Sequence, residues 1–435
     1  MKTLDHIPTG KLQRAGKLVQ TGVKLGGNYI KYMGDKIVDP ANAREKLDEE
    51  NAKDIYDGLK SLKGSALKVA QMLSMEKNLL PSAYVERFSL AQFSVPPLSG
   101  PLVRKIVKKH LGKYPEDFFD TFTAESVNAA SIGQVHLATK EGKKLAVKIQ
   151  YPGVANSIGS DLALVKPVAT RMFNLKGQDT EKFFKEIEEK LTEETDYTLE
   201  LKQSLSIKEA CQHIPNLLLP NYYADFSCEK ILTMDWMEGI HLSEYTLDNT
   251  DQALNNRIGQ TLWDFYMYQM HVLRAVHADP HPGNFLVTEQ GELVAIDFGC
   301  IKIVPEDFYN PYFELASENA INDKTLFVEK ITALEILRTD DDAAARAYII
   351  ALFHDMLSVF TQPFHGETFD FSDEGFWSKI AQMSERLAND DYLRKLNGNR
   401  GSRHFLYINR TFFGLYNLMH DLKAEIIVDN YKRYV

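Results

Sequence analysis

One stretch near the middle of the chain constrains its fold and chemistry most. It reads HADPHPGN at residues 277–284 and IDFG at residues 296–299. It supplies two carboxylates, Asp279 and Asp297, and one amide, Asn284. Hard oxygen ligands of this kind suit Mg²⁺, which needs only one or two carboxylates besides phosphate oxygens and water. The stretch therefore predicts a site for a metal and a phosphate group.

The order and spacing of these residues are those of a protein kinase. Asn284 follows Asp279 by five residues (284 − 279), and Asp297 follows Asn284 by 13 (297 − 284). In a kinase the first Asp is the catalytic base, the Asn holds a metal, and the Asp of Asp-Phe-Gly binds Mg²⁺. Either motif alone recurs by chance, but the two in this order, after a strand-like LVAIDF, are specific.

Composition limits the other possibilities. A chain of 435 residues can hold two or three domains, or one two-lobed enzyme with an extension. The net charge of −10 argues against nucleic acid as a general partner. Cys211, Cys228 and Cys300 share no metal-ligand spacing and read as reduced thiols of a cytosolic protein.

No targeting or membrane-spanning segment is expected. The first residues build no apolar stretch of a secretory signal, and nowhere do 18 apolar residues run without a charge. We therefore expect a cytoplasmic protein, either soluble or peripheral to a membrane, without a signal peptide or a transmembrane helix.

Residues 1–36 are basic, against the trend of the chain. They contain only two acidic residues, Asp5 and Asp35. Their seven basic residues are Lys2, Lys11, Arg14, Lys17, Lys24, Lys31 and Lys36. A basic amphipathic segment can lie on an anionic membrane surface, or it can be a helical extension packed on the protein. The two interpretations are compatible.

Residues 44–75 have the apolar spacing of a helix, with Lys68 and Gln71 on its second side. That second side also carries Leu67 and Met72, so we expect it to be covered. A covered lysine needs a partner, because an unpaired buried charge is costly. The simplest pairing sets Lys68 against the acidic run that contains Glu194 and Asp196. The alternative is a surface lysine beside two partly exposed apolar residues.

Residues 126–152 predict two antiparallel strands joined by a turn at Glu141-Gly142. The first begins with a small-residue loop around Ala129, Ala130 and Ser131, and the second ends at Ala-Val-Lys148. This resembles the phosphate loop and strand lysine of a kinase N-lobe. Alanine resists the positive φ values that glycine adopts freely, so we expect a stiffer loop than in kinases.

An acidic helix is expected from residue 181 to residue 210. Its seven acids between residues 186 and 200 are Glu186, Glu188, Glu189, Glu193, Glu194, Asp196 and Glu200. Most should form a solvated face, and one should pair with Lys148. Residues 230–239 are then predicted to form an edge strand that leads into a hinge. The hinge backbone from Asp235 to Met237 would contact adenine.

After Gly299 the chain departs from protein kinases. Val304-Pro305-Glu306 follows within a few residues, where a kinase has an activation loop and an Ala-Pro-Glu. The platform that holds a substrate peptide is therefore not expected here. Residues 306–435 look all-helical.

Five signatures together resemble the UbiB/ADCK family of atypical, protein-kinase-like proteins linked to ubiquinone and other isoprenoid quinone biosynthesis. They are Lys68-Val69-Ala70-Gln71, Asn128-Ala129-Ala130-Ser131 with IGQVH, AVKIQYPGV with Lys148, Glu194-Thr195-Asp196 with Glu200, and HADPHPGN with DFG. They span residues 55 to 300, and the resemblance covers nearly the whole chain. Two positions depart from the family pattern, because Ala70 replaces a glycine and Asn128 replaces an alanine.

The resemblance implies an α+β, two-lobed, protein-kinase-like fold. It has a helical N-terminal extension at 1–115 with the Lys-x-x-Gln motif, an antiparallel-sheet N-lobe at 116–238, and a mainly helical C-lobe at 239–435. In the family the extension covers the cleft that a peptide would enter. The resemblance also implies binding of ATP and Mg²⁺, and work at a membrane with quinone precursors and quinone-biosynthesis proteins.

The resemblance also implies a role for each residue. Lys148 and Glu200 would be the phosphate-positioning pair, and Asp279 the base or water-orienting group. Asn284 and Asp297 would be the metal ligands. The lid residues would be Lys68, Gln71, Glu194 and Asp196.

Three functions fit these expectations. The first is an atypical kinase or ATPase that serves isoprenoid quinone or membrane-lipid metabolism. The second is a small-molecule kinase unrelated to quinones, although a covered helix with Lys68 argues against an open cleft. The third is a nucleotide-gated lipid-binding scaffold with little catalysis, against which the complete set of Asp279, Asn284 and Asp297 argues mildly.

Overall fold

The hairpin expected near residue 140 is the centre of the N-terminal sheet. Strands β3 (Gly133–Lys140) and β4 (Lys143–Gln150) pair antiparallel along their whole length. Glu141 and Gly142 between them have φ values of 52° and 79°. Two successive positive φ values are what a tight hairpin turn requires, and glycine accepts them without strain.

The computed structural model divides the chain into two units. The first is Met1–Leu201 with Tyr222–Trp236, and the second is Lys202–Asn221 with Met237–Val435. The structure describes residues 11–39, 42–62, 68, 87, 97–129, 132–172, 178–248, 250–388, 390, 392–393, 396 and 400–435.

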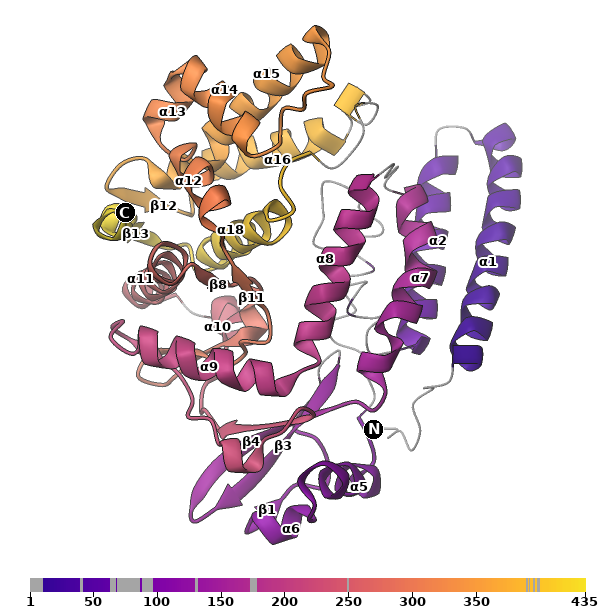
Figure 1. Cartoon of the computed structure of the whole chain (residues 1–435), viewed down its shortest axis with the longest axis vertical. Helices are drawn as coiled ribbons and strands as arrows, with labels where there is room; N and C mark the ends of the chain where they lie inside the picture. The colour runs from indigo at the N-terminus through magenta and orange to yellow at the C-terminus, as the bar shows by residue number, and fades with distance from the viewer. Residues whose placement is uncertain are drawn as a thin grey trace. The chain divides into compact units, whose positions relative to one another are not determined.

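The first unit joins an antiparallel sheet to helices (Figure 1). The strand order is β1-β3-β4-β6, with β2 also paired to β3, so β6 is an edge strand as expected. The remaining strands are β1 (Thr121–Phe122), β2 (Asn128–Ala129) and β6 (Ile231–Asp235). Its helices are α1 (Lys11–Val38), α2 (Ala43–Leu62), α5 (Gly100–Leu111), α6 (Pro115–Phe118), α7 (Val154–Met172), α8 (Gln178–Glu194) and the start of α9 (Tyr197–Cys211), with a 3₁₀ turn at Ala224–Phe226.

The second unit is mainly helical, with short strands that flank the loops at residues 277–284 and 296–299 (Figure 1). Its strands are β5 (Leu217–Leu218), β7 (Ile240–His241), β8 (Ala275–His277), β9 (Phe285–Val287), β10 (Leu293–Ala295), β11 (Ile301–Ile303), β12 (Thr368–Asp370) and β13 (Glu425–Ile427). Its helices are α10 (Leu242–Asp248), α11 (Gln252–Tyr268), α12 (Glu306–Glu314), α13 (Glu318–Asn322), α14 (Lys324–Ala333), α15 (Ala343–Phe360), α16 (Glu374–Ala388) and α18 (Phe405–Asp421).

The fold agrees with the expected α+β, kinase-like class, and two details of the sequence prediction are wrong. The acidic helix breaks at Thr195 and Asp196, so that α8 and α9 are separate. The C-terminal part is not all-helical, because β12 and β13 pair antiparallel. A two-stranded ribbon of three residues per strand is too short to leave a clear period-2 signal in sequence.

The division into three domains stays a prediction. The first unit ends at Trp236, two residues before the expected boundary at 238, and it contains both the extension and the N-lobe. Residues Lys202–Asn221 belong to the second unit, although they were expected in the N-lobe.

One helix among the described residues, α15, is long and apolar enough to cross a membrane by length and composition. Its buried residues are Ala345, Ile349 and Leu352, and it also carries the charges Arg346 and Asp355. A single helix of this kind is weak evidence for a span, because the core helix of a soluble protein passes the same test.

A buried polar relay explains the IGQVH stretch. Gln134 Oε1 accepts from the Leu98 backbone N–H at 2.7 Å, and Gln134 Nε2 lies 2.8 Å from His136 Nε2. His136 Nδ1 lies 2.8 Å from the Thr123 carbonyl oxygen, which can only accept. Nδ1 therefore carries the proton, and Nε2 accepts from Gln134. The relay fixes the chain just after Pro97 to the sheet, and it is complete only while His136 is neutral.

This relay predicts a loss of stability in acid. Burial lowers the pKa of His136, partly opposed by its bond to Thr123. Below the unfolded-state pKa, about 6.5, the unfolded chain binds more protons than the folded one, so stability falls as the pH falls. We expect the melting temperature to drop more steeply between pH 7 and pH 5 in the wild type than in His136→Gln. The difference should approach at most about 1.4 kcal/mol per pH unit.

The exposed His213 provides the control for this experiment. His213→Gln should follow the wild-type pH profile. Equal pH profiles for wild type and His136→Gln would contradict the neutral, buried state of His136.

Candidate functional site

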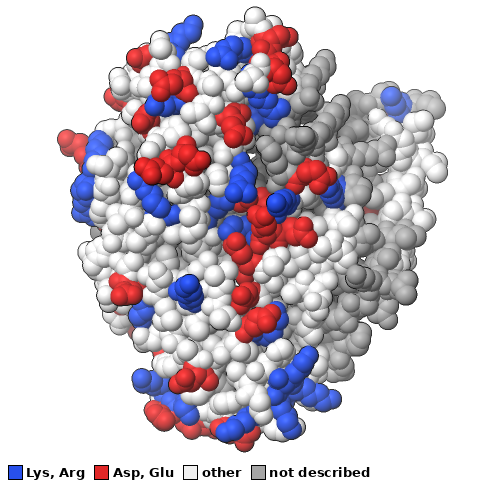
Figure 2. All heavy atoms as spheres, viewed as in Figure 1, with Lys and Arg blue, Asp and Glu red and all other residues white. Residues whose placement is uncertain are grey.

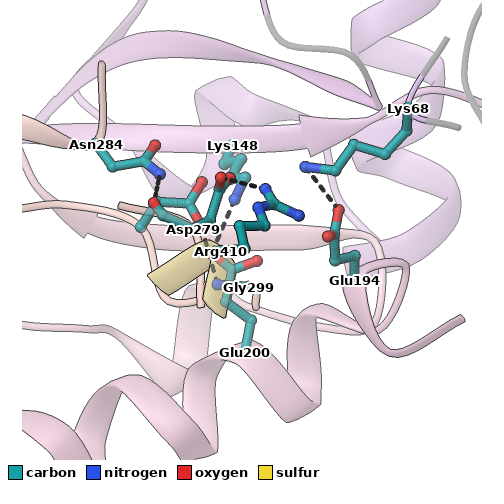
Figure 3. Close-up of polar contacts among 9 residues, drawn as sticks. Lys68, Lys148, Glu194, Glu200, Asp279, Asn284, Gly299 and Arg410 are labelled. Atoms are coloured by element: carbon teal, nitrogen blue, oxygen red, sulfur yellow. Dashed lines mark hydrogen bonds and ion pairs between the residues drawn. The ribbon is translucent and has the colours of Figure 1, made fainter. Parts of the chain in front are cut away.

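Lys148 forms a buried ion pair in the first unit. It lies on β4, which is hydrogen-bonded to β3 on one side and β6 on the other. Its Nζ lies 2.8 Å from Glu200 Oε1, and the two side chains are 11% and 3% exposed (Figure 3). The Tyr197 ring lies against the same ammonium, 5.0 Å from Nζ to the ring centre. The structure thus gives Lys148 an acidic partner from the predicted run, and the partner is Glu200.

The junction between α8 and α9 is tied to the sheet by its backbone. The Thr195 carbonyl oxygen accepts from Gln150 Nε2 at 2.9 Å and from Lys230 Nζ at 3.0 Å. The Tyr197 backbone N–H donates to the Glu229 carbonyl at 3.1 Å. These bonds fix the start of α9, and with it the position of Glu200 one turn along.

Asp196 caps α9. Its Oδ1 accepts from the backbone N–H groups of Thr198 at 2.9 Å and Leu199 at 3.3 Å. A carboxylate at a helix N-terminus satisfies orphan donors and interacts favourably with the helix dipole. The single acidic helix expected from residue 181 to residue 210 is therefore interrupted here, and Asp196 directly precedes the second of two helices.

The acidic run is also less solvated than expected. Glu186, Glu194 and Glu200 are buried, at 4%, 7% and 3% exposed. Three of the seven acids therefore point into the protein.

Lys68 pairs with the acidic run, as the sequence predicted. Its Nζ lies 3.1 Å from Glu194 Oε2, and the side chains are 13% and 8% exposed (Figure 3). Glu194 ends α8, so this pair and the Lys148–Glu200 pair lie on either side of the α8–α9 junction. The role of Lys68, Glu194 and Asp196 as a lid stays a prediction.

The predicted nucleotide loop is only partly described. Gln71 of the Lys-x-x-Gln motif, and Ala130 and Ser131 of the loop, lie outside the described residues. Ala129 ends β2, where it pairs with Gln134 of β3. The loop's hold on phosphates therefore stays a prediction.

The hinge residues follow the edge strand. Asp235 ends β6, and its Oδ1 accepts from the Tyr223 hydroxyl at 2.6 Å. This hydrogen bond to Asp235, together with burial, raises the pKa of Tyr223 to about 12. The first unit ends at Trp236 and the second resumes at Met237, so the predicted adenine-binding backbone lies where the chain passes between units.

The catalytic loop of the second unit folds around Asp279. The Asp279 carbonyl oxygen accepts from the His281 backbone N–H at 2.7 Å and from Asn284 Nδ2 at 2.9 Å (Figure 3). His281 Nδ1 accepts from Gly283 N–H at 3.0 Å, which caps the 3₁₀ turn at Pro282–Asn284. The amide nitrogen of Asn284 thus faces the loop, and its Oδ1 is not used in that bond.

The donor set of Asn284 and Asp297 fits Mg²⁺. The Ile296 N–H donates to the Asn284 carbonyl at 3.1 Å, so the two segments adjoin. Asp297 Oδ1 accepts from the Gly299 N–H at 2.9 Å. Within the described ranges no group of three or more His, Cys, Asp or Glu could hold a metal. One carboxylate and one amide suit an ion that takes its other ligands from phosphate and water.

Arg410 is the site residue that the sequence analysis missed. Its guanidinium, on α18, lies 2.5 Å from Asp279 Oδ1, and the side chains are 11% and 18% exposed (Figure 3). Burial is the largest single influence on the pKa of Arg410 and lowers it, but the surrounding groups, Asp279 foremost, together raise that pKa. The two residues are 131 apart in sequence.

A signal for Arg410 was nevertheless present. It is the only charge in the stretch FLYINRTFFGLYNLM at residues 405–419, which has the texture of a buried helix. A cation in such a helix needs a partner, because an unpaired buried charge is costly.

The Lys68–Glu194 pair gives a stability prediction. Lys68→Ala should lower the free energy of unfolding by about 3–5 kcal/mol, because it removes a cationic partner from the buried Glu194 carboxylate. The measurement is chemical denaturation of wild type, Lys68→Ala, Glu194→Ala and the double mutant, which isolates the coupling energy of the pair.

The exposed pair Lys24–Asp54 is the matched control, with Lys24 52% exposed. Removal of Lys24 should cost less than about 1 kcal/mol. A Lys68→Ala protein as stable as the Lys24→Ala protein would show that Lys68 is a solvated surface residue.

Comparison with known proteins agrees with this geometry. Residues 90–331 match the ABC1 atypical kinase-like domain. A solved structure of Rv3197 from Mycobacterium tuberculosis, in complex with erythromycin, superposes with a TM-score of 0.62 over 90% of this chain and 97% of that one. Its sequence is 24% identical, so it supports the fold alone.

Curated relatives include an uncharacterised chloroplastic aarF domain-containing protein kinase of Arabidopsis thaliana. It is 28% identical over 78% of this chain and 49% of its own length. The mitochondrial atypical kinase COQ8 of Saccharomyces cerevisiae is 28% identical over 78% of this chain and 69% of its own length. The chain spans about half the length of the first of these relatives.

These matches agree with the resemblance to UbiB/ADCK proteins that the five signatures carry. The domain match covers more than half of the 435 residues. The chain belongs to the ABC1 atypical kinase-like family.

Proposed function

We propose that the protein is an atypical kinase or ATPase that transfers the terminal phosphoryl group of Mg·ATP to water or to a small acceptor. The observation that supports this most is the buried Lys148–Glu200 ion pair. In kinases a strand lysine held by a helix glutamate contacts the phosphates, and the pair must form for activity. If Lys148 had only a structural role, an apolar residue would fill its place at a lower cost in folding free energy, because buried ion pairs rarely add net stability.

Each residue then has a defined task. Lys148, oriented by Glu200, binds the α- and β-phosphates, and the loop at residues 129–131 covers them. Asn284 Oδ1 and the Asp297 carboxylate would hold Mg²⁺, which would neutralise charge on the phosphate oxygens. Asp279 orients the attacking hydroxyl or water and accepts its proton. The backbone from Asp235 to Met237 binds adenine.

The acceptor is small, or it is water. Only six residues separate Gly299 from the start of α12 at Glu306, so the usual peptide platform has little room. Relatives named COQ8 supply the context of ubiquinone biosynthesis. We therefore propose an acceptor or effector from isoprenoid quinone or membrane-lipid metabolism.

A second function is favoured by one observation. Arg410 occupies Oδ1 of Asp279, the group that would act as base. A protein whose base is held in this way can use nucleotide binding as a switch for a lipid ligand, with little turnover. Multiple-turnover phosphate release by the purified protein separates the two proposals.

The metal site gives the main test. Asp297→Asn should abolish the thermal stabilisation by Mg·ATP, because Asp297 supplies the protein charge opposite the metal. A saturating ligand raises stability by about 2.7 kcal/mol at 100 times its Kd, so the loss is measurable by thermal shift.

Asp370→Asn is the matched control, since Asp370 Oδ1 also accepts from the backbone N–H two residues ahead. It should retain the full Mg·ATP shift. An unchanged shift in Asp297→Asn would remove Asp297 from the metal site.

A membrane surface is the proposed location of this activity, with α1 as the docking element. Two lysines of α1 face α2, since Lys24 pairs with Asp54 and Lys31 with Glu50. Val23, Ile30 and Met33 are 72%, 76% and 58% exposed. The described surface over α1, at the right of the view, is mostly uncharged (Figure 2). The helix therefore combines basic residues with an outward apolar face, as interfacial helices do.

This geometry predicts weak, partly salt-dependent binding to anionic vesicles. Ile30→Asn should reduce sedimentation with vesicles that contain anionic phospholipid, because it removes apolar area from the docking face. Salt should weaken wild-type binding only in part, since two of the lysines already have acidic partners. Leu247→Asn, at an 81% exposed apolar position in the second unit, should bind like the wild type. Equal binding by both variants would reject α1 as the docking element.

A further inference from the structure

One face of α18 contacts residues 277–303 at three points. These residues, called the catalytic segment here, run from the catalytic loop to the strand after the Asp-Phe-Gly. Tyr407, Arg410 and Gly414 are three and then four residues apart, so they lie along one side of the helix. Arg410 holds the Asp279 carboxylate, as described above. The other two residues have no part in that ion pair, and each has its own contact.

Gly414 allows α18 to approach the catalytic loop closely. A Cβ at this position would lie 3.0 Å from the Pro280 carbonyl oxygen and 3.2 Å from Pro280 Cβ, and still closer to the Pro280 ring. Pro280 is buried and directly follows Asp279. Neither a backbone oxygen nor a proline ring can swing aside, so any side chain at 414 must displace the loop or the helix.

Tyr407 contacts the strand that follows the Asp-Phe-Gly. Lys302 of β11 is 5% exposed, and its Nζ lies 5.4 Å from the centre of the Tyr407 ring. A desolvated ammonium over a tyrosine face is a favourable cation–π contact. β11 pairs with β8, which leads into the catalytic loop, and Ala278 N–H donates to the Cys300 carbonyl at 2.8 Å. α18 thus contacts both the catalytic loop and the strand that follows the Asp-Phe-Gly.

We propose that α18 acts as a splint, that is, a helix that holds the catalytic segment in position. Gly414 and Tyr407 are then positioning residues for Asp279. The inference rests on the proposed phosphoryl-transfer function for its kinetic consequences, but not for its structural ones. In this chain α12 begins soon after Gly299, so no long segment packs over the loop from that side. α18 supplies the missing support from more than 100 residues further along.

The test compares two glycines of the second unit at which an added Cβ would clash with a neighbour. At Gly259 of α11 the nearest atoms to a Cβ would be Ala424 Cβ at 2.6 Å, the flexible Met419 side chain near the end of α18 at 3.3 Å, and Ile426 at 3.4 Å, none of which belongs to the catalytic segment. Gly414→Ala should lower kcat for ATP turnover roughly 10- to 100-fold, with KM for Mg·ATP unchanged, because a displacement of about 1 Å at a reacting group has that effect. Gly259→Ala should lower the melting temperature and leave kcat unchanged.

A rescue variant and a structural readout complete the experiment. Gly414→Ala with Pro280→Ala removes the proline ring and should recover part of the lost kcat. Hydrogen exchange should rise in Gly414→Ala at residues 278–284 and remain at wild-type rates there in Gly259→Ala. Tyr407→Leu removes the ring that faces Lys302 and should raise exchange over residues 301–303.

The outcomes separate the two proposals. If the wild-type protein shows no ATP turnover, the proposed enzyme activity is wrong. Hydrogen exchange alone then tests whether α18 holds the catalytic segment in position. Wild-type exchange at residues 278–284 in Gly414→Ala would overturn the splint. So would a kcat loss in Gly414→Ala no larger than that in Gly259→Ala.

Discussion

The buried ion pair between Lys148 and Glu200 is the interaction on which the first unit depends. Removal of two charges from water costs several kcal/mol per ion, and attraction repays this only when the geometry is held. Here the sheet holds the lysine, since β4 is bonded on both sides. The bonds of Gln150 and Lys230 to the Thr195 carbonyl hold the glutamate's helix. The Tyr197 ring lies against the ammonium, 5.0 Å from Nζ to the ring centre.

The same junction links this pair to Lys68. Glu194 ends α8 and Glu200 lies in the first turns of α9, with Thr195 and Asp196 between them. If Lys68 moves and α8 moves with it, either the start of α9 shifts or the hydrogen bonds to the Thr195 carbonyl break. Because both ion pairs are buried, breaking those bonds costs free energy. The physical link between Lys68 and Lys148 is thus the short break between α8 and α9.

Much of this arrangement could be predicted from sequence, because its signals are local. The hairpin followed from alternation and a Glu-Gly turn, and the partner of Lys68 followed from an excess of acids. The break at Asp196 was missed because a helix stop and start without glycine or proline leaves an unbroken helical period. Asp196 is an ordinary N-cap residue, yet in an acidic run it could not be told from its neighbours.

The Asp279–Arg410 contact could not be paired from sequence, because nothing local connects residues 131 apart. The lone arginine in an apolar helix indicated only that some partner exists. Its identity depends on how α18 packs, and that depends on a glycine whose importance appears only when Pro280 is seen against it.

The two carboxylates of the second unit are therefore in different electrostatic settings. Asp279 faces a buried guanidinium whose raised pKa keeps it charged at any physiological pH. Asp297 Oδ1 instead accepts from the Gly299 backbone N–H of its own turn. The protein thus supplies a buried guanidinium to Asp279 by way of α18. Two identical side chains 18 residues apart (297 − 279) therefore have different hydrogen-bond partners.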